Sequence, residues 1–462
     1  MSTEQQLKDD RSGLLNHLKA LTEAGEPERV LKIAESMLYE NAQDAAGLFY
    51  AARALSDQRH EETAYTLMQQ ACLLRPDKEE MWQNMGHLAD KLWRFEEAIF
   101  CYGQAHARNP NNPENLASMA SAYVGLGKPE LAIIYANRAL ELQPNNEIAA
   151  VNRGFGYLCL GNWKKGWEGY EHMVGHKSMR RKATAYTSPP KFWNGEHENV
   201  VVYTEQGIGD GIMFASCIPD LQAIANRVVI DCEPKLQGLF RRSFPDCSVF
   251  GTRHEKAPIW LGNFGVDSSI AIGSLPKRFR NAKEDFPGTP YLTADPLRRV
   301  MYRALLDAYP EGLKVGISWI GGNSLGGLRK LELDRLRDLV TAFPEISWFS
   351  LNYREFDTDL PITRLPYATE TEDYDDTAAL VAELDLVISV PQAVVHLAGA
   401  LGKECWCMAP DVTRWIYGRD GSEHPWYGSV RIFRGWDTIT DQIKSALVEK
   451  LRPRLEIANA SS

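Results

Sequence analysis

The segment Trp82-Gln-Asn-Met-Gly-His-Leu-Ala89, with the proline that follows it at Pro110, recurs along the first third of the chain. Pro76, Pro110 and Pro144 stand 34 residues apart, and the residues between them repeat in step. In each copy a small residue such as Gly86 lets one helix approach the next, and the proline ends the second helix because it has no N–H to donate. A fixed period of this length predicts a stack of helical hairpins.

This pattern resembles the tetratricopeptide repeat (TPR) family. A weaker copy runs from Leu14 to Met37, and a decayed copy runs from Gly154 to Tyr170. We therefore expect an all-α TPR solenoid over residues 1–176, with about four to five repeats of which the last is degenerate. Such a solenoid offers a concave groove that can bind a peptide or pack against a neighbouring domain. The matching positions are Leu48, Ala51, Ala52, Leu55, Ala64, Met68, Ala71 and Pro76 in one copy, Trp82, Met85, Gly86, Ala89, Ala98, Tyr102, Ala105 and Pro110 in the next, and Leu116, Met119, Ala120, Tyr123, Ala132, Ala136, Ala139 and Pro144 in the third.

Length and composition are typical of a soluble protein with several domains. The chain has 462 residues, which is too many for one core and suits a repeat array followed by two further domains. No apolar run approaches the roughly 18 residues that a membrane span needs, and the polar N-terminus has no secretory signal, so we expect a cytoplasmic protein. The eight cysteines lack the spacing of metal ligands, and we interpret them as small core residues.

Charge is distributed unevenly along the chain. The net charge is −10, and residues 1–150 contain 14 Lys and Arg against 22 Asp and Glu. This balance disfavours a general nucleic-acid clamp but is compatible with a local basic patch. Segment 177–192 carries such a patch, and we expect it to be a basic linker that is either solvated or in contact with an anionic donor or acceptor. Its cations are Lys177, Arg180, Arg181 and Lys182.

Beyond Pro189 and Pro190 the pattern changes to strands, Gly-rich turns and helices. Gly207 and Gly209 allow close backbone approach after a strand and leave helix N–H groups facing an anion or polar ligand. Their spacing is not the GxGxxG of dinucleotide sites, so this signal alone is weak. The expected elements are a strand at 199–204, a turn at 205–211, a helix at 212–225 and a strand at 227–231.

A second α/β unit begins after a helix-like stretch at 296–309. Its first strand is followed by a Gly-rich loop at 321–327 and a helix that Asp334 can cap. Two doubly wound halves in tandem, with a ligand cleft between the carboxyl ends of their strands, is the arrangement that this order favours. The expected strands are 314–319, 346–351, 384–389 and 404–408, and the expected helices include 377–383 and 392–401.

The run Asp385-Leu-Val-Ile-Ser-Val-Pro-Gln-Ala-Val-Val-His-Leu-Ala-Gly-Ala-Leu-Gly-Lys403 resembles the donor-nucleotide segment of heptosyltransferase-like GT-B glycosyltransferases. Glu205-Gln-Gly-Ile-Gly-Asp210 resembles the N-terminal-domain loop of the same family. The resemblance covers nearly the whole chain, and a TPR array fused to such a domain is a familiar bacterial and phage arrangement. Protein O-GlcNAc transferases are similar in architecture, although the motifs fit the heptosyltransferase-like group better.

The resemblance implies a GT-B fold, in which two Rossmann-like α/β domains face each other across a cleft. Residues 193–300 would form the acceptor-side domain, residues 301–452 the nucleotide-sugar donor domain, and residues 453–462 a flexible tail. The implied activity is transfer of a sugar from a nucleotide-sugar to an acceptor hydroxyl, inverting and without a metal or tightly bound cofactor. The acceptor is left open between a protein, a glycan and, less favoured, modified DNA, and neither the sugar nor the nucleotide is specified.

Asp210 falls on the acidic position where this family places the general base. A hydroxyl is a poor nucleophile until its proton is accepted, which is why the chemistry needs a carboxylate there. Glu205 is the substitute base. Asp210 could instead simply cap the helix that begins at this turn.

The donor-binding residues implied by the resemblance are glycines, cations and polar side chains in the loops that follow the strands. Arg329 and Lys330 would stabilise the leaving diphosphate, although surface placement remains an alternative. His396 would lie near the donor phosphates or orient the preceding loop, or be a satisfied core histidine. The complete set is Gly207, Gly209, Gly322, Asn323, Arg329, Lys330, Asn352, Gln392, His396, Asp411 and Arg414.

One departure from the family pattern leaves a second function open. Relatives usually carry Asp-Thr where this chain has Pro391-Gln392, and those residues help to hold the donor. Gln392 can still donate a hydrogen bond, so donor binding would be altered or lost. The alternative function is therefore a non-catalytic TPR scaffold whose transferase domain has degenerated.

Overall fold

The structure is a computed structural model that describes residues 3–173, 190–255, 257–321, 330–353 and 358–461, with side chains between Arg11 and Arg452. The chain forms two compact units, Met1–Tyr157 and Leu158–Ser462. The division between the two units falls within helix α9, which spans Glu147–Cys159.

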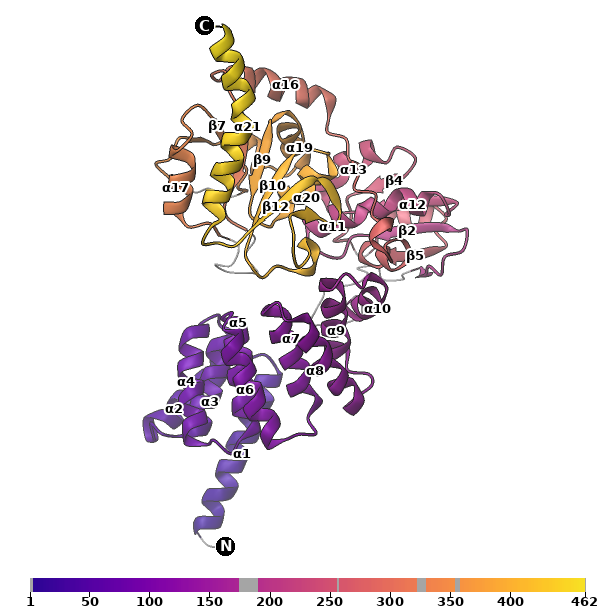
Figure 1. Ribbon diagram of the computed structural model, residues 1–462. Coiled ribbons are helices and arrows are strands. Elements are labelled where there is room, and N and C mark those ends of the chain that lie inside the picture. Colours follow the sequence, from indigo (N-terminus) through magenta and orange to yellow (C-terminus); the bar gives the residue numbers. More distant parts are fainter. Residues whose placement is uncertain (1–2, 174–189, 256, 322–329, 354–357, 462) are drawn as a thin grey trace. The chain divides into compact units, whose positions relative to one another are not determined.

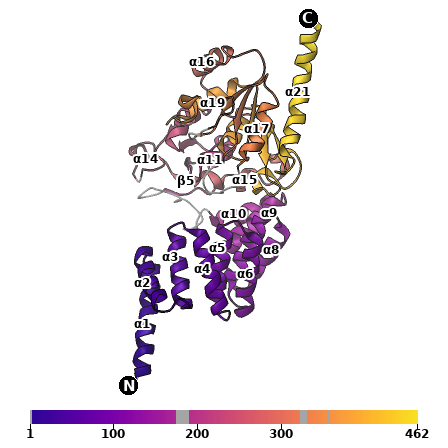
Figure 2. The same ribbon diagram turned by 90° about the vertical axis from the view of Figure 1, so that its left-hand side faces the viewer.

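The first unit is built of antiparallel helix pairs, which stand side by side in Figure 2. Side-chain caps begin two of these helices, because Asp44 accepts from the N–H groups of Ala46 and Gly47, and Asn112 accepts from that of Glu114. The all-α repeat architecture predicted from the 34-residue period is confirmed. Its helices, with the tenth that follows them, are α1 Thr3–Glu23, α2 Pro27–Glu40, α3 Ala45–Asp57, α4 Glu61–Leu74, α5 Glu79–Lys91, α6 Phe95–Arg108, α7 Pro113–Gly125, α8 Pro129–Leu142, α9 Glu147–Cys159 and α10 Trp163–Met173.

The predicted small residue at Gly86 is where α5 and α6 approach each other. A Cβ added at Gly86 would lie 2.6 Å from Cε1 of Tyr102, closer than atoms can pack. Tyr102 and the alanines that face it, Ala89 and Ala98, are fully buried in the core of the repeats. Close packing of this pair therefore depends on the missing side chain.

The second unit contains two sheets, both visible in Figure 1. The first sheet has the order β1-β5-β2-β3-β4, and all of its neighbouring strands are parallel. Parallel strands with helical crossovers are what the alternating strand and helix pattern predicted. The strands are β1 Lys191–Phe192, β2 Asn199–Tyr203, β3 Arg227–Asp231, β4 Ser248–Phe250 and β5 Ser268–Ala271, and the helices are α11 Ile208–Phe214, η1 Ala215–Cys217, α12 Ile218–Gln222, η2 Pro234–Leu236, α13 Gln237–Ser243, α14 Ile259–Asn263, η3 Ile272–Ser274, α15 Pro276–Phe279 and η4 Lys283–Asp285.

The second sheet has the order β11-β12-β10-β9-β6-β7-β8 and is parallel apart from the β11–β12 pair. Alternate residues of its central strands, such as Val315, Leu386 and Trp406, pack in one core cluster with apolar residues of α17 and α21. The strands are β6 Lys314–Ser318, β7 Ser347–Ser350, β8 Ile362–Thr363, β9 Leu386–Ser389, β10 Cys405–Ala409, β11 Glu423–His424 and β12 Tyr427–Arg434, and the helices are α16 Pro296–Asp307, α17 Leu333–Thr341, α18 Pro366–Thr369, α19 Tyr374–Glu383, α20 Ala393–Ala400, η6 Trp415–Tyr417 and α21 Ile439–Ser461.

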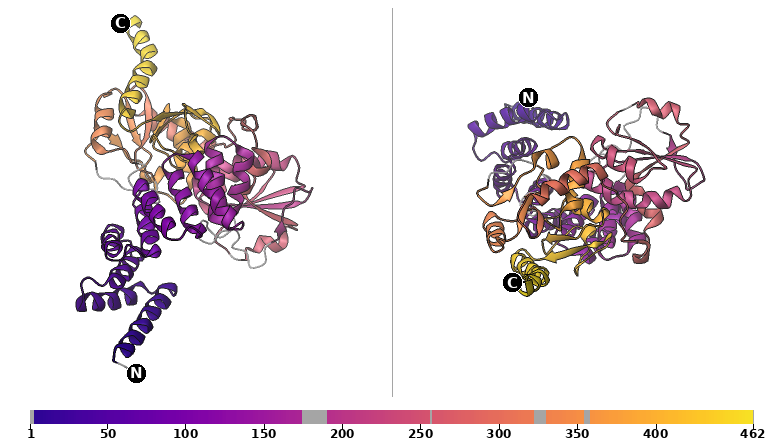
Figure 3. Two further views of the ribbon diagram at one scale, coloured as in Figure 1. Left: turned by 60° about the horizontal axis from the view of Figure 1, so that its bottom comes forward. Right: turned by 90° about the horizontal axis from the view of Figure 1, so that it is seen from above.

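Three predictions about individual elements differ from the structure. The helix expected at 212–225 begins earlier, at Ile208, and is interrupted before α12, where Pro219 has no N–H to continue the ladder. Asp334 does not cap α17: Glu332 occupies the N-cap position, and Asp334 lies in the first turn, where the helix dipole favours a carboxylate. The tail expected at 453–462 is helical as far as Ser461, since α21 continues through it beyond the second sheet (Figure 3).

Helix α10 packs with the α/β unit, although the repeat region was expected to extend to residue 176. Trp167 donates from Nε1 to the backbone oxygen of Arg280 at 2.6 Å. Its ring lies 5.3 Å from that of Trp415 and 6.4 Å from that of Trp426, measured between centroids. Edge-to-face contacts of this kind bury large apolar areas. Trp167 of α10 therefore contacts the first half of the α/β unit at Arg280 and the second half at Trp415 and Trp426.

All eight cysteines are free, and seven of them are buried. None of the helices in the described part of the chain combines the length and the apolar character that a membrane crossing requires.

Replacing Gly86 by alanine is expected to lower the free energy of unfolding of the repeat unit by about 1–3 kcal/mol, because the added methyl group would overlap the Tyr102 ring. Gly103 on α6 is the matched control, since nothing lies within 4 Å of a Cβ added there. Gly103→Ala is expected to stabilise by about 1 kcal/mol through helix propensity alone. Urea unfolding followed by circular dichroism measures both, and equal effects of the two changes would contradict the packing argument.

Candidate functional site

Two loops that carry predicted site residues follow parallel strands, one in each sheet of the second unit. The loop after β2 contains Glu205, Gly207 and Asp210, and the loop after β9 leads to Gln392 and His396. Ligands of parallel α/β sheets bind outside the carboxyl ends of the strands. The sequence therefore placed both loops at the edge where a ligand is expected.

Helix α11 lies directly on α20, which brings the two loops together. A Cβ added at Gly209 would lie 3.1 Å from Cδ2 of His396 and 3.2 Å from Cα of Ala393. A side chain at Gly209 would therefore press on the backbone of α20. The absence of that side chain lets the turn that carries Asp210 reach the helix that follows β9.

The Glu205 side chain is enclosed and only 1% exposed. Its Oε1 accepts a hydrogen bond from Nε2 of Gln206 at 2.9 Å, and the same nitrogen donates to the Tyr170 hydroxyl. Among the described residues, Oε2 of Glu205 has no hydrogen-bond partner. Burial raises the pKa of Glu205 to about 7, so this carboxyl group keeps its proton through much of the range in which glutamate is normally charged.

Asp210 is partly exposed in the first turn of α11. Its Oδ2 accepts from the backbone N–H of Gly207 at 3.2 Å, so the capping contact that the sequence offered as an alternative is present. Burial, and after it the negative charge of Asp210, raise the pKa of Tyr170 well above its usual value, because the carboxylate and the phenol lie close together. Asp210 thus caps α11 while part of it remains open to solvent.

Asn352 and Gln392 belong to one hydrogen-bonded cluster at the carboxyl ends of β6, β7 and β9. Gln392 donates from Nε2 to the hydroxyls of Ser318 and Ser389, and Ser318 donates to Oδ1 of Asn352 at 2.6 Å. Asn352 is 5% exposed, and no described residue accepts a hydrogen bond from its Nδ2. An unsatisfied buried amide is costly, so this cluster retains donors that a bound polar group can use.

His396 lies within the contact between α11 and α20 and is 5% exposed. Its Nδ1 is 3.3 Å from the hydroxyl of Tyr427, and its Nε2 is 3.3 Å from that of Tyr417. Burial, followed by the charge of His396, lowers the pKa of the neighbouring His424 well below its usual value. The imidazole of His396 lies among the rings of Tyr417 and Tyr427, with both of its nitrogens near hydroxyl groups, as expected for the satisfied core histidine that the sequence analysis gave as an alternative.

The remaining predicted residues lie around this centre or outside the described part of the chain. Lys330 pairs through its backbone with Ile320, and Asp411 and Arg414 are exposed in the loop after β10. The residues outside the described ranges are Gly322, Asn323 and Arg329, together with the linker cations Lys177, Arg180, Arg181 and Lys182.

Sequence reasoning did not assign roles to several polar residues that order the site. Arg434 holds the loop after β10, because it donates to the backbone oxygen of Tyr417 at 2.7 Å and to Oγ1 of Thr413 at 3.1 Å. Ser318 and Ser389 end their strands at the same edge of the sheet, and this shared position was the available signal. Tyr291 and Tyr417 carried no signal, because their partners are far away in the sequence.

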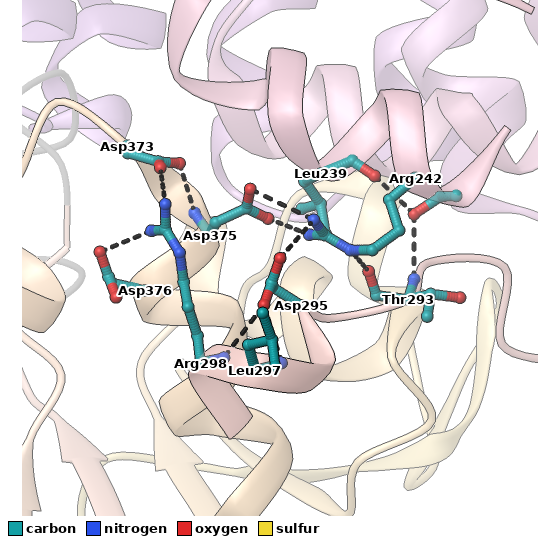
Figure 4. Close-up of polar contacts among 10 residues, drawn as sticks. Leu239, Arg242, Thr293, Asp295, Leu297, Arg298, Asp373, Asp375 and Asp376 are labelled. Carbon is teal, nitrogen blue, oxygen red and sulfur yellow. Dashed lines mark hydrogen bonds and ion pairs between the residues drawn. The ribbon is translucent and has the colours of Figure 1, made fainter. Parts of the chain in front are cut away.

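A network of ion pairs connects the two halves of the second unit (Figure 4). Arg242 on α13 pairs with Asp375 on α19 and, at 3.3 Å, with Asp295 before α16. Arg298 on α16 pairs with Asp373 at 2.7 Å and with Asp376 at 2.6 Å. Asp375 is 4% exposed, and a buried carboxylate of this kind needs its cation. Arg242 therefore fixes α13 of the first sheet against α19 of the second.

The fold and the site define a helical repeat protein joined to an α/β unit with two largely parallel sheets. Residues 79–112 and 113–146 each match the tetratricopeptide repeat family, so this part of the chain consists of TPR repeats. TPR repeats are typical of proteins that bind other proteins. The matched residues coincide with helices α5 to α8 and their connections.

Three known proteins are similar to parts or most of this chain. Protein FlbA of Caulobacter vibrioides is 27% identical over 449 residues, which span 88% of this chain and 72% of FlbA. TPR repeat-containing protein MJ0798 of Methanocaldococcus jannaschii is 36% identical over 86 residues, which span 18% of this chain and 25% of that protein. The structure of MamA from Desulfovibrio magneticus RS-1 covers 36% of this chain and 93% of its own, with 18% identity and a TM-score of 0.31.

Replacing Glu205 by glutamine is expected to stabilise the protein in a pH-dependent way. Because the folded-state pKa of about 7 exceeds the usual 4.5, the cost of keeping this carboxyl group buried is absent below pH 4.5, grows as the pH rises and is complete above pH 7. Glu205→Gln should therefore raise the free energy of unfolding by up to about 3 kcal/mol at pH 8 and have little effect near pH 4.5. Denaturant titrations at both pH values measure this difference, and an equal effect at the two would rule out a buried, protonated Glu205.

Proposed function

We propose that the α/β unit is a glycosyltransferase of the GT-B type, which transfers a sugar from a nucleotide-sugar donor to an acceptor hydroxyl. The observation that supports this most is the contact at Gly209, because it joins the turn carrying Asp210 to the helix that follows β9. Asp210, which follows β2 of the first sheet, thereby lies beside the edge of the second sheet where the donor would bind. The resemblance of both loops to heptosyltransferase-like enzymes supports the same function.

In the proposed reaction, the Asp210 carboxylate accepts the proton of the acceptor hydroxyl. The acceptor oxygen then forms its bond to the anomeric carbon while the bond from that carbon to the donor phosphate breaks. The nucleoside diphosphate leaves on the opposite side, and the configuration at the anomeric carbon is inverted. Asp210 suits this role better than Glu205, because Asp210 is partly exposed whereas Glu205 is enclosed and holds its proton near neutral pH.

The donor would bind with its diphosphate at the N-terminus of α20. Gln392 at the N-cap provides no side-chain hydrogen bond to the helix, so the first N–H groups of α20 and its dipole are available to an anion. Lys330 would add a positive charge to balance the leaving group without a metal. The unsatisfied Nδ2 of Asn352 would donate to an oxygen of the donor.

The repeats would select the acceptor or a partner of the enzyme. A protein acceptor suits TPR repeats best, whereas a glycan and modified DNA remain as other acceptors that the test can identify. A cytoplasmic location is consistent with the supply of nucleotide-sugars there.

A non-catalytic scaffold is the second candidate, and one observation favours it. The amide nitrogen of Gln392 donates to Ser318 and Ser389 within the protein, at the position where relatives use Asp-Thr to hold the donor. A scaffold of this kind would bind its partner through the repeats and would not bind nucleotide-sugars.

Replacing Asp210 by asparagine is expected to reduce sugar transfer by about 10²–10⁴-fold, because the amide cannot accept the acceptor proton. Folding should be nearly unchanged, since asparagine is also a good helix cap. Asp246→Asn is the matched control, because it removes a carboxylate from an exposed position. Transfer is measured by mass spectrometry of the acceptor, and full activity of Asp210→Asn would exclude Asp210 as the base.

Specific thermal stabilisation by one nucleoside diphosphate among ADP, UDP, GDP and dTDP, or by CMP, is expected for the full-length protein. Lys330→Ala should raise the nucleotide concentration needed for the same stabilisation about tenfold, because one cation facing the phosphates is lost. Lys283→Ala is the control, because Lys283 is 81% exposed. No stabilisation by any nucleotide, in a protein that unfolds cooperatively, would favour the scaffold.

A further inference from the structure

A chain of hydrogen-bonding side chains connects α20 with α11, in which Tyr427, His396 and Tyr417 are buried and Tyr291 is partly buried. The Tyr291 hydroxyl donates to the backbone oxygen of Ile212 on α11 at 2.8 Å. The Tyr291 and Tyr427 hydroxyl oxygens are 3.5 Å apart, and that of Tyr427 lies 3.3 Å from Nδ1 of His396 on α20. The chain continues from Nε2 of His396 to the hydroxyl of Tyr417 at 3.3 Å.

The number of donors available sets the direction of the hydrogen bonds in this chain. Each tyrosine hydroxyl has a single proton to donate, and Tyr291 donates it to the backbone oxygen of Ile212. For both contacts of Tyr427 to be hydrogen bonds, Tyr427 donates to Tyr291 and accepts from His396, so in the proposed chain the imidazole carries its proton on Nδ1 and accepts at Nε2 from Tyr417. Burial raises the pKa of both Tyr291 and Tyr427, which keeps these hydroxyls protonated as donors. The whole chain therefore ends on the backbone of α11.

Helix α11 is thus held at two points that flank Asp210. Gly209 lies against His396 and Ala393, and Ile212 accepts the hydrogen bond of Tyr291. A second glycine completes the arrangement, because a Cβ added at Gly399 would lie 2.3 Å from the ring of Tyr427. The ring can occupy this place only because Gly399 has no side chain.

We propose that His396, Tyr427 and Tyr291 are positioning residues, which set the depth and rotation of α11 on α20 and thereby the place of the Asp210 carboxylate. This inference rests on the proposed function for its consequence, though not for its geometry. His396 acts through the two tyrosines and its contact with Gly209, and it does not serve as a ligand of the donor phosphates. Misplacement of a catalytic group by about 1 Å costs on the order of 10²-fold in rate, so such a chain has a measurable effect.

Tyr291→Phe tests the proposal, because it removes one hydroxyl and keeps the ring. Amide hydrogen exchange of residues 208–214 should accelerate about tenfold, and sugar transfer should fall about 10–100-fold with an unchanged KM for the donor. Tyr302→Phe is the matched control: Tyr302 is a buried tyrosine outside the chain, and its hydroxyl bonds to Asp376 in the ion-pair network. Unchanged exchange of residues 208–214 in Tyr291→Phe would overturn the proposal.

Gly209→Ala tests the second contact. The added methyl group would press on the Ala393 backbone, so exchange of residues 208–214 should accelerate here as well. Gly211→Ala lies on the same helix, and its Cβ would find only ordinary contacts, the nearest at 3.5 Å from Cγ2 of Thr204. This control should leave exchange unchanged or slow it, and equal acceleration in both variants would count against the contact at Gly209.

The tautomer of His396 provides a measurement on the unaltered protein. Nitrogen chemical shifts of the imidazole should report a proton on Nδ1, and a proton on Nε2 would overturn the directed chain. Both exchange and tautomer are measured without turnover. If they agree with the proposal while no nucleotide-sugar is ever used, the positioning chain stands and the proposed transferase function fails.

Discussion

The packing of α11 on α20 at Gly209 is the constraint on which the candidate site depends. Glycine at this position allows the two helices to approach until a Cβ would touch both the His396 ring and the backbone of Ala393. Because Asp210 is the next residue, this contact helps to set its position relative to the carboxyl-end edge of the second sheet. Helix propensity opposes glycine within α11, so the close approach outweighs an unfavourable local preference of about 1 kcal/mol.

Two interactions of different physical character support that contact. The aromatic face of α10 contacts Trp415 and Trp426 of the second half through Trp167, and Phe214 on α11 through Tyr170. These contacts bury apolar area and are insensitive to salt. The pairing of Arg242 with Asp375 acts elsewhere, between α13 and α19, and includes a buried carboxylate whose loss of partner would be costly. The two interactions thus join the two sheets through separate elements. Neither of them involves Asp210, Gln392 or His396.

The sequence predicted most of the fold because its signals are local and periodic. The 34-residue period gives the repeats, and short β-branched runs give β2, β6 and β9 within one or two residues. It also predicted that Asp210, Gln392 and His396 follow strands. It could not predict the contacts of Tyr291 and Tyr417, because a single tyrosine has no sequence pattern and its partner lies far along the chain. Pro219 could have predicted the interruption of the helix. The packing of α10 with the α/β unit could not be predicted, because the partners of α10 lie more than 100 residues away.

Burial separates the two carboxyl groups of the β2 loop into different chemical roles. Glu205 is surrounded by protein, and its raised pKa means that it is partly neutral at pH 7 and can donate a proton to a hydrogen bond. Asp210 lies in the first turn of α11, accepts a hydrogen bond from the Gly207 N–H and is partly exposed. Sites that perform acid–base chemistry commonly pair two carboxyl groups whose environments differ in this way. Only four residues lie between Glu205 and Asp210, yet the first is buried and the second is partly exposed, so the second is the better placed of the two to accept a proton from an acceptor.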